Sequence, residues 1–393
     1  MINALLGKVA DIFKKDYLFA SFLPALVFLA VLMVTVGGVA GFGMMWEWLE
    51  AMSALQKATL STAIGVLVVV FAYLLNALRP ICAHFWSGTS NFPLFLPWGF
   101  HGLARLLRRQ GFRRLQARAT RSATWREVLD WFTAEVDKTW KTDGTQPSDR
   151  QMKWLMFRVR ALDTGLGKDT LKAFLDPVVR AFEKYSGEAL KDVYRAVKMT
   201  LMEFQSEADM RQQTAIAALD RKFGTFETIR PTILGNVVEA YNQYSFKRYK
   251  IEAEIFWPRL RKVIPDEYMA LLDEPRILLD FSLTMASLAA LYAVCALLVG
   301  PWLWFNLPLW IGLALVAIGV AVAFYGVGLV AAHQLGELVR ASFDLFRLDL
   351  MTDLGRPRPT TFRDERRQWE EVSQVVAYGD DVDFAIAAAG AGK

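Results

Sequence analysis

The sequence predicts an all-α polytopic membrane protein, in which four transmembrane helices flank a helical cytoplasmic domain. Residues 281–336 contain no Asp, Glu, Lys or Arg over 56 positions. That length allows two crossings, because one helix needs roughly 20 apolar residues to span the hydrocarbon core. Two further uncharged runs, Leu18–Trp46 and Ala58–Leu78, lie near the N-terminus. We therefore expect two transmembrane helices in the first part of the chain and two in the last part.

The composition agrees with a membrane protein that carries a sizeable polar part. With 54% hydrophobic and 22% charged residues, the chain is too apolar for an average soluble protein and too charged for a bare bundle of spans. The predicted segments, in chain order, are an interfacial amphipathic helix at 1–17, a first transmembrane hairpin at 18–79, a cytoplasmic helical domain at 80–276, a second transmembrane hairpin at 277–333, and cytoplasmic C-terminal helices with a flexible tail at 334–393.

The distribution of Lys and Arg around the spans sets the expected orientation. The loop between the last two spans carries no charge, and the loop between the first two carries only Glu47, Glu50 and Lys57. Lys and Arg gather on the other flanks, and such an excess marks the cytoplasmic side. We therefore expect a multi-pass protein of the cell (inner) membrane with both termini in the cytoplasm. On this topology Cys82 and Cys295 lie at opposite ends of the spans, which excludes a disulfide between them.

A basic amphipathic arm at 101–121 follows the second span. No acidic residue occurs between Glu50 and Glu127, so this stretch is strongly cationic. Such an arm binds anionic lipid headgroups at about 1 kcal/mol per basic residue near the surface. Directly after a span, lipid is the expected partner rather than nucleic acid. The residues expected at the lipid surface are Arg105, Arg108, Arg109, Arg113, Arg114, Arg118 and Arg121. Capping boxes at Thr124–Glu127 and Ser148–Gln151 then predict the starts of water-facing helices.

Small residues recur along one side of the fourth span. The positions Gly312, Gly319, Ala323 and Gly326 are separated by sevens, threes and fours, which places them on one helical stripe. Because helices in lipid associate by close packing, this stripe is expected to be a helix–helix interface, within one chain or between chains. Ionisable residues are almost absent from the spans. Asp280 is expected to be a helix-start or interfacial residue at the entrance of the third span.

The segment 230–280 is the most distinctive part of the polar region. It holds a Pro-Thr-Ile-Leu-Gly-Asn run at 231–236, an Arg-Tyr pair, and a Trp-Pro-Arg-Leu run at 257–260, just before the second hairpin. This arrangement resembles a group of uncharacterised bacterial integral membrane proteins that share such a block. The resemblance implies a membrane setting and no particular activity. The residues that carry it are Pro231, Gly235, Asn236, Arg248, Tyr249, Trp257, Pro258 and Arg259. The block is expected to pack the polar domain against the membrane face, with a ligand pocket as the alternative.

Catalytic and cofactor motifs are absent from the sequence. There is no phosphate-binding glycine loop, no nucleophile elbow and no His-Glu-x-x-His motif, and the small number of Cys and His argues against a metal site of those ligands. We therefore expect a non-enzymatic membrane anchor, scaffold or sensor without a cofactor. Its expected partners are the lipid bilayer and anionic lipids, with a cytoplasmic protein or a homo-oligomer as further candidates. The alternatives are an oligomeric ion channel or pore gated by the cytoplasmic domain, and a membrane enzyme that acts on lipid.

Overall fold

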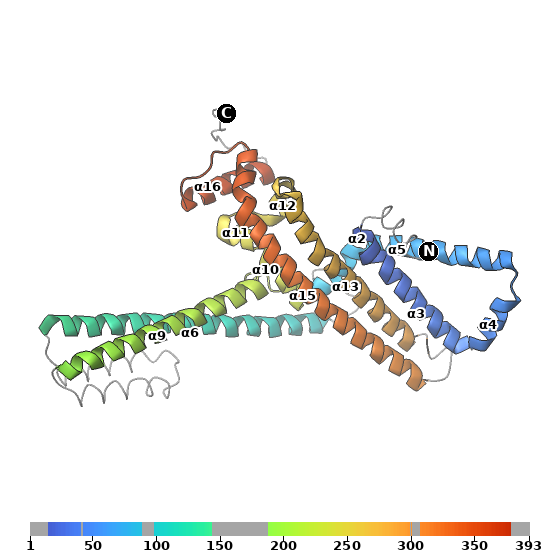
Figure 1. Ribbon diagram of the computed structural model, residues 1–393, viewed down its shortest axis with the longest axis horizontal. Helices are drawn as coiled ribbons and strands as arrows, with labels where there is room; N and C mark the ends of the chain where they lie inside the picture. Colours follow the sequence, from blue (N-terminus) through green and yellow to red (C-terminus); the bar gives the residue numbers. More distant parts are fainter. Residues whose placement is uncertain are drawn as a thin grey trace. The chain divides into compact units, whose positions relative to one another are not determined.

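In the computed structural model, residues 15–40, 42–88, 98–143, 188–298, 300 and 307–378 are described. The regular elements in these ranges are helices, with no strand among them. Four helices are long and apolar enough to cross a membrane (Figure 1), and these are Leu18–Thr35, Ala54–Ser87, Asp266–Leu298 and Leu307–Asp353. The predicted all-α class is thereby confirmed for the described residues, and four candidate spans lie where the sequence predicts them. The interfacial helix expected at 1–17 lies outside the described residues apart from Lys15–Tyr17, and so does the expected tail from 379 onward.

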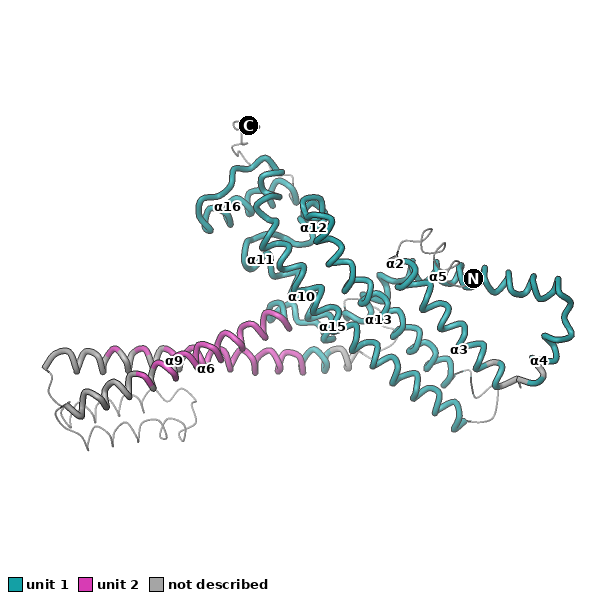
Figure 2. Tube along the Cα trace, viewed as in Figure 1, with its two compact units in different colours: residues 1–106, 223–393 teal, residues 107–222 magenta. Residues whose placement is uncertain are grey.

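The chain divides into two compact units (Figure 2). The first comprises 1–106 and 223–393, and the second comprises 107–222. The helices of the first unit are α2 (Lys15–Tyr17), η1 (Leu18–Phe22), α3 (Leu23–Ala40), α4 (Phe42–Ala51), α5 (Ala54–Ser87), α10 (Ile233–Asn242), α11 (Tyr244–Tyr249), α12 (Ala253–Val263), α13 (Asp266–Leu298), α15 (Leu307–Asp353), α16 (Phe362–Ser373) and η2 (Gln374–Tyr378). The helix α6 (Trp98–Asp143) begins in the first unit and continues in the second, which also holds α9 (Glu188–Lys222).

The first span begins with an irregular turn. η1 is a π-helical turn, and α3 starts directly after it, with Pro24 as its second residue. Proline lacks a backbone N–H, so a change in the hydrogen-bonding pattern just ahead of it has a clear physical cause. Further along, the side chains of Thr35 and Tyr292 share a hydrogen bond of 2.8 Å. This bond ties the first span to α13.

The second span is longer than its apolar run. Ser53 and Gln56 form a capping box at the start of α5, in which each side chain accepts from the backbone N–H of the other residue. The helix continues through Pro80 and ends at Gly88, whose φ of +67° lies in the left-handed region that favours glycine. The boundary expected between residues 79 and 80 therefore falls inside a helix.

The helices α13 and α15 form the second hairpin and pack against each other (Figure 1). Around Trp310, this packing is made by four alanines: Ala293, Ala296, Ala314 and Ala317. Small side chains let two helix backbones approach closely, which is the main way that helices in lipid gain packing energy.

Both helices of this hairpin continue into a polar head, by which we mean residues 223–275 and 334–378. Three large side chains are fully buried at its centre, namely Phe256, Phe343 and Trp369. The rings of Phe256 and Trp369 meet edge to face with centroids 5.4 Å apart. Leu272 of α13 and Phe343 of α15 belong to the same core. The head is therefore built around the ends of the two spanning helices.

In the second unit, α6 and α9 lie side by side and antiparallel (Figure 2). The Arg126 Nε atom lies 3.2 Å from Asp209 Oδ1, and Gln205 Nε2 donates to Asp130 Oδ1 at 2.8 Å. Rising numbers on α6 thus pair with falling numbers on α9. Ala208 of α9 is buried, as expected for a helix-packing position.

The helix start expected at Thr124–Glu127 is wrong, because α6 runs unbroken from Trp98 to Asp143. A Thr-x-x-Glu spacing caps a helix only where the preceding chain leaves the helical conformation. The sequence before Thr124 is rich in Leu, Arg and Ala, which are strong helix formers. The capping box expected at Ser148–Gln151 lies outside the described residues.

Candidate functional site

Arg79 of α5 joins the first three spans. It donates hydrogen bonds to Asp280 Oδ2 at 3.1 Å, to Ser21 Oγ at 3.2 Å and to the Asp16 carbonyl at 3.4 Å. The side chains of Arg79 and Asp280 are only 17% and 27% exposed. A charge in a low-dielectric interior is costly unless it is paired and hydrogen-bonded. Here the guanidinium meets partners from three elements, so it holds α2, η1 and α13 to α5.

Asp280 does not start a helix, because α13 begins at Asp266. Its ion-pair partner Arg79 lies 201 positions earlier in the chain. The carboxylate lies in α13 directly before the uncharged run that begins at residue 281, and Arg79 of α5 holds it there. A mostly buried ion pair at the end of a candidate span is a candidate functional site.

The Pro-Thr-Ile-Leu-Gly-Asn run forms a tight turn into α10. The Thr232 hydroxyl accepts a hydrogen bond from the Gly235 N–H at 3.0 Å and caps the helix. The Asn236 side chain accepts from the Arg230 N–H at 2.8 Å and donates to the Arg230 carbonyl at 2.8 Å. Asn236 is buried, and it supplies the polar partners that the buried backbone of the turn requires.

Gly235 is a point of close approach between α10 and the end of α5. A Cβ atom at this position would lie 1.9 Å from the carbonyl oxygen of Ser87, a separation at which the backbone has to shift. Pro231 packs over Gly88 at the same place, with its Cγ 2.6 Å from where a Cβ of Gly88 would lie. Glycine is required at 235 because two backbones pass too closely for any side chain.

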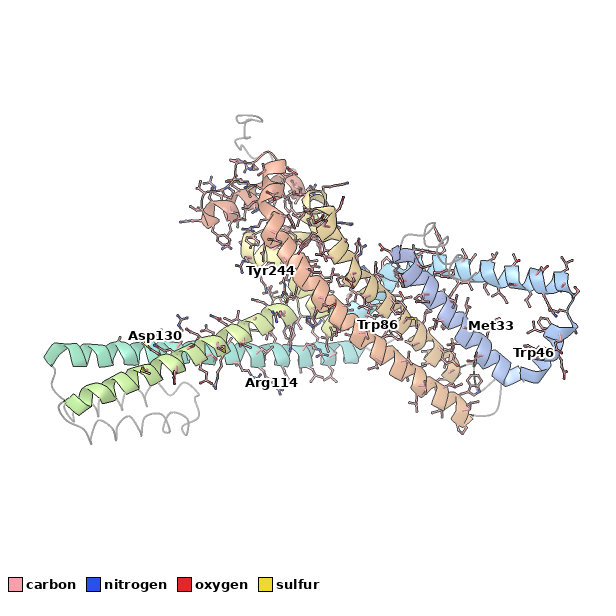
Figure 3. All side chains as sticks on the ribbon, in the orientation of Figure 1. Met33, Trp46, Trp86, Arg114, Asp130 and Tyr244 are labelled. Carbon is pink, nitrogen blue, oxygen red and sulfur yellow. The ribbon has the colours of Figure 1, made fainter. Side chains whose placement is uncertain are left out.

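Two aromatic residues complete this junction (Figure 3 labels Trp86). Trp86 Nε1 donates to Ser287 Oγ at 2.9 Å, and its ring lies 5.2 Å from the ring of Tyr325. The Tyr325 hydroxyl accepts from the Leu234 N–H at 3.2 Å. These contacts connect α5, α13, α15 and α10. An apolar groove of about 320 Å³ lies beside the two rings.

Hydrogen bonds from two tyrosines fix the head to the extension of α15. The Tyr249 hydroxyl donates to Asp344 Oδ1 at 2.6 Å, and the Tyr244 hydroxyl donates to Asp344 Oδ2 at 2.9 Å. Burial raises the pKa of Tyr249, and the hydrogen bond to Asp344 raises it further. Burial also raises the pKa of Tyr244, again followed by the hydrogen bond to Asp344. Both phenols therefore remain neutral donors to one carboxylate.

Cations surround the two tyrosines. The Arg347 guanidinium lies 4.1 Å from the ring centre of Tyr249, and the Arg340 guanidinium lies 5.5 Å from that of Tyr244. Arg347 also donates from Nε to Glu365 Oε1 of α16 at 2.6 Å. Such charge-assisted bonds are stronger than neutral ones. Through them the extension of α15 is bound to both α11 and α16.

The remaining residues that carry the resemblance of the 230–280 block lie beside these tyrosines, in the core of the head or on its surface. Arg248 is exposed beside the tyrosine pair, and the Trp257 ring lies 6.1 Å from that of Phe343 in the core. Pro258 and Arg259 are exposed on α12. A groove of about 510 Å³ in the head is lined by other residues of α10, α11 and α12 and the turns beside them. The described contacts of the block are thus hydrogen bonds and packing contacts within the chain.

The basic arm occupies the start of α6 (Figure 3 labels Arg114). Of its predicted lipid-surface residues, those exposed are Arg105, Arg109, Arg113, Arg114 and Arg118. Arg108 is half-buried, and the side chain of Arg121 lies outside the described residues.

The predicted small-residue stripe of the fourth span does not face α13. All four of its members are exposed, namely Gly312, Gly319, Ala323 and Gly326. A Cβ atom added to any of the three glycines would meet nothing within 4 Å. A different set of small residues is buried on α15: Ala314, Ala317, Ala321 and Gly328. The contact within one chain therefore uses the opposite side of the helix, and a contact between chains through the predicted stripe stays a prediction.

Sequence reasoning did not single out Arg79 or Asp344. A signal for Arg79 was available, because it is the one charged residue between Lys57 and Arg105 in the whole sequence. No comparable signal marked Asp344, which lies among several charged residues of an amphipathic helix. In the part of the chain that the structure describes, no group of His, Cys, Asp or Glu is arranged to hold a metal ion.

No protein-family model, curated protein or solved structure matches this chain. The resemblance of the 230–280 block to bacterial membrane proteins therefore remains a prediction.

Proposed function

We propose that this protein is a non-enzymatic anchor of the cell membrane that presents its polar head and basic arm at the inner leaflet. In this role it acts as a scaffold for a cytoplasmic protein or as a sensor, with both termini in the cytoplasm. The observation that carries the proposal is that α13 and α15 belong both to the spans and to the core of the head.

The length of α15 supports this proposal. Its 47 residues correspond to about 70 Å at 1.5 Å per residue, more than twice the roughly 30 Å of a hydrocarbon core. The part beyond the apolar stretch supplies Val339, Phe343 and Leu350 to the core of the head. The head therefore cannot separate from the hairpin without exposing its own core.

The use of charge in the head also favours an anchor. A general acid or base has to reach the proton that it transfers, whereas Asp344 accepts from two tyrosines and Glu365 accepts from Arg347. These carboxylates bind other parts of the same chain. Their arrangement suits a rigid mount better than a catalytic centre acting on lipid.

A flux measurement distinguishes an anchor from the alternative, an oligomeric pore. The full chain is reconstituted in liposomes loaded with K⁺ or with a small anionic dye, with gramicidin as the positive control for K⁺. We expect release at the rate of protein-free liposomes. Release that rises with the ratio of protein to lipid would contradict the proposal and favour the pore.

A second measurement tests whether the head holds a partner. Phe246 is an exposed aromatic residue of α11 and accepts a photo-crosslinking phenylalanine analogue without loss of core packing. In cells, a scaffold is expected to give a discrete cross-linked protein from this position, while the same analogue at the lipid-facing Val316 serves as the control. Identical patterns from the two positions would argue against a head-specific partner.

A further inference from the structure

The first turns of α6 expose an apolar patch. Leu103, Leu106 and Leu107 are 53–57% exposed, although leucine in a water-soluble helix normally faces a core. Their spacing of three, four and one places them on one side of the helix. Arg108, Phe112 and Leu115 lie on the other side and are half-buried. The leucines therefore form an outward face of the helix.

Arginines continue the same side of α6 beyond the leucines. Arg114 and Arg118 follow Leu107 by seven and eleven residues, which returns them to the leucine side, and both are exposed. Seven residues of α-helix are about 10 Å long. In one leaflet, a headgroup layer about 5–10 Å thick separates the acyl chains from the water-facing surface. The distance along α6 from the leucine patch to Arg114 thus matches the thickness of the headgroup layer.

The chain keeps this patch near a membrane. α5 ends at Ser87 and α6 begins at Trp98, and eleven peptide steps extend over at most about 40 Å. No Asp or Glu occurs between Glu50 and Glu127, so this side of α6 has only positive charge to offer. An anionic surface with an apolar layer beneath it is complementary to both features.

From this geometry we infer that the first turns of α6 enter the cytoplasmic leaflet at a slant. The three leucines lie at the level of the upper acyl chains, and Arg114 and Arg118 lie at the level of the lipid phosphates. The partner is a leaflet rich in anionic phospholipid. The inference rests on the membrane anchoring proposed above and adds an insertion depth that changes along the helix.

Depth-dependent fluorescence quenching tests the slant. The full chain with Cys82→Ala and Cys295→Ala, which removes its two cysteines, receives one new cysteine at Leu107, Gln110, Ala117 or Gln116 and an environment-sensitive dye. The proteins are reconstituted in phosphatidylcholine vesicles with and without phosphatidylserine, containing lipids with a nitroxide on the acyl chain. Gln116 lies away from the leucine side of the helix and is the matched control.

We expect quenching to fall severalfold along the leucine side, from 107 through 110 to 117, and to be weakest at 116. Phosphatidylserine should deepen the labels at 107 and 110. With the dye at 110, Leu103→Gln/Leu106→Gln/Leu107→Gln should lose most of the quenching. Arg114→Gln/Arg118→Gln should lose the dependence on phosphatidylserine, and added salt should do the same by screening.

Other outcomes overturn the inference. Equal quenching at all four positions would show a helix that lies flat or crosses fully, and no quenching would show a helix in water. A dye that is shielded from water but not quenched by nitroxide lipids would show that protein covers the leucines. Release of the quenched label by a single-stranded oligonucleotide at physiological salt would assign the arginines to nucleic acid. None of these results changes the flux or cross-linking outcome, so the anchor proposal is tested separately.

Discussion

The Tyr249 hydroxyl donates a hydrogen bond to Asp344 at 2.6 Å, across 95 positions of sequence. It joins α11, which lies in the 230–280 block, to the extension of α15. Because the acceptor is a carboxylate group and the tyrosine is buried, this bond belongs to the stronger class of hydrogen bonds in proteins.

Replacing Tyr249 by Phe is expected to loosen the head from α15. The variant leaves Asp344 with one tyrosine instead of two, and a hydrogen bond to a charged group contributes about 1.5–3 kcal/mol. Thermal unfolding of the full chain in nanodiscs should show a clear fall in Tm. Tyr244→Phe is the matched control and should cost less, because Tyr244 is more exposed. Equal losses for the two variants would contradict the leading role of Tyr249.

The stability of the protein is expected to fall between pH 10 and pH 12. Burial raises the pKa of Tyr241 from its ordinary value of 10.0 to about 12, and the negative charge of Asp280 adds to the shift. The folded chain then keeps a proton that the unfolded chain loses, so this contribution is present below pH 10 and is lost as the pH rises. Tyr241 alone contributes at most about 1.4 kcal/mol per pH unit to this slope.

Tyr241→Phe should remove this slope while other titrating groups stay the same. The comparison is the difference between variant and parent in denaturant unfolding at pH 9 and at pH 11. A parent and variant that lose stability in parallel over this range would show that Tyr241 is not the responsible group.

Removing either partner of the Arg79–Asp280 pair is expected to be more damaging than removing both. Arg79→Leu removes the ion-pair partner of a mostly buried carboxylate, and breaking a buried pair typically costs about 3–5 kcal/mol. Arg79→Leu/Asp280→Leu leaves no charge to satisfy. Thermal unfolding in nanodiscs should place the double variant above both single variants. Additive losses would mean that the two residues act independently.

A larger side chain should lower the stability of one chain on one side of α15 and leave it unchanged on the other side. Ala321 is buried and lies on the side that carries the other buried small residues, whereas Ala323 is exposed. Ala321→Leu is expected to lower Tm because overpacking typically costs about 1–3 kcal/mol. Ala323→Leu should leave Tm unchanged. If Ala323→Leu instead changes the oligomeric state on size exclusion, the exposed stripe joins copies of the chain.

The orientation predicted from Lys and Arg is open to a direct test. Reporter fusions at Gly144 and after Lys393 should both report the cytoplasm, and a fusion at Asn306 should report the opposite side. A fusion at Thr352, near the end of α15, should agree with Gly144. A non-cytoplasmic signal at Gly144 would reverse the assignment.

The spans were predictable because their signal is local. A run without charge long enough to cross a membrane reads the same in any tertiary context, and all four crossings appear as helices. Local signals were less reliable at helix ends. Thr124 and Glu127 have the spacing of a capping box, yet Thr124 lies inside α6. The residues on both sides of it have high helix propensity, so the helix continues.

The contact of Arg79 with Asp280 and that of Tyr249 with Asp344 were not predictable, because they pair residues that are far apart in the sequence. Nothing in the periodicity around Arg79 or Asp280 indicates that the two helices meet at these positions. The fourth span shows the same difficulty in another form. It carries small residues on two opposite sides, and only the packed structure distinguishes Ala321, which is buried, from Ala323, which is not. The Pro-Thr-Ile-Leu-Gly-Asn run drew attention to Gly235. The sequence did not show that the backbone carbonyl of Ser87 passes so close to this position that only glycine fits.

The unbroken course of α15 makes it a lever. From Gly319 to Asp344 the helix is about 37 Å long at 1.5 Å per residue. A tilt of about 10° at Gly319, well within the range that spanning helices adopt when bilayer thickness changes, would swing Asp344 sideways by roughly 6 Å. Because Asp344 is bound to α11, the swing would be passed to the head. The thickness of the surrounding bilayer would thereby be converted into a displacement of the surface that faces the cytoplasm in the proposed topology.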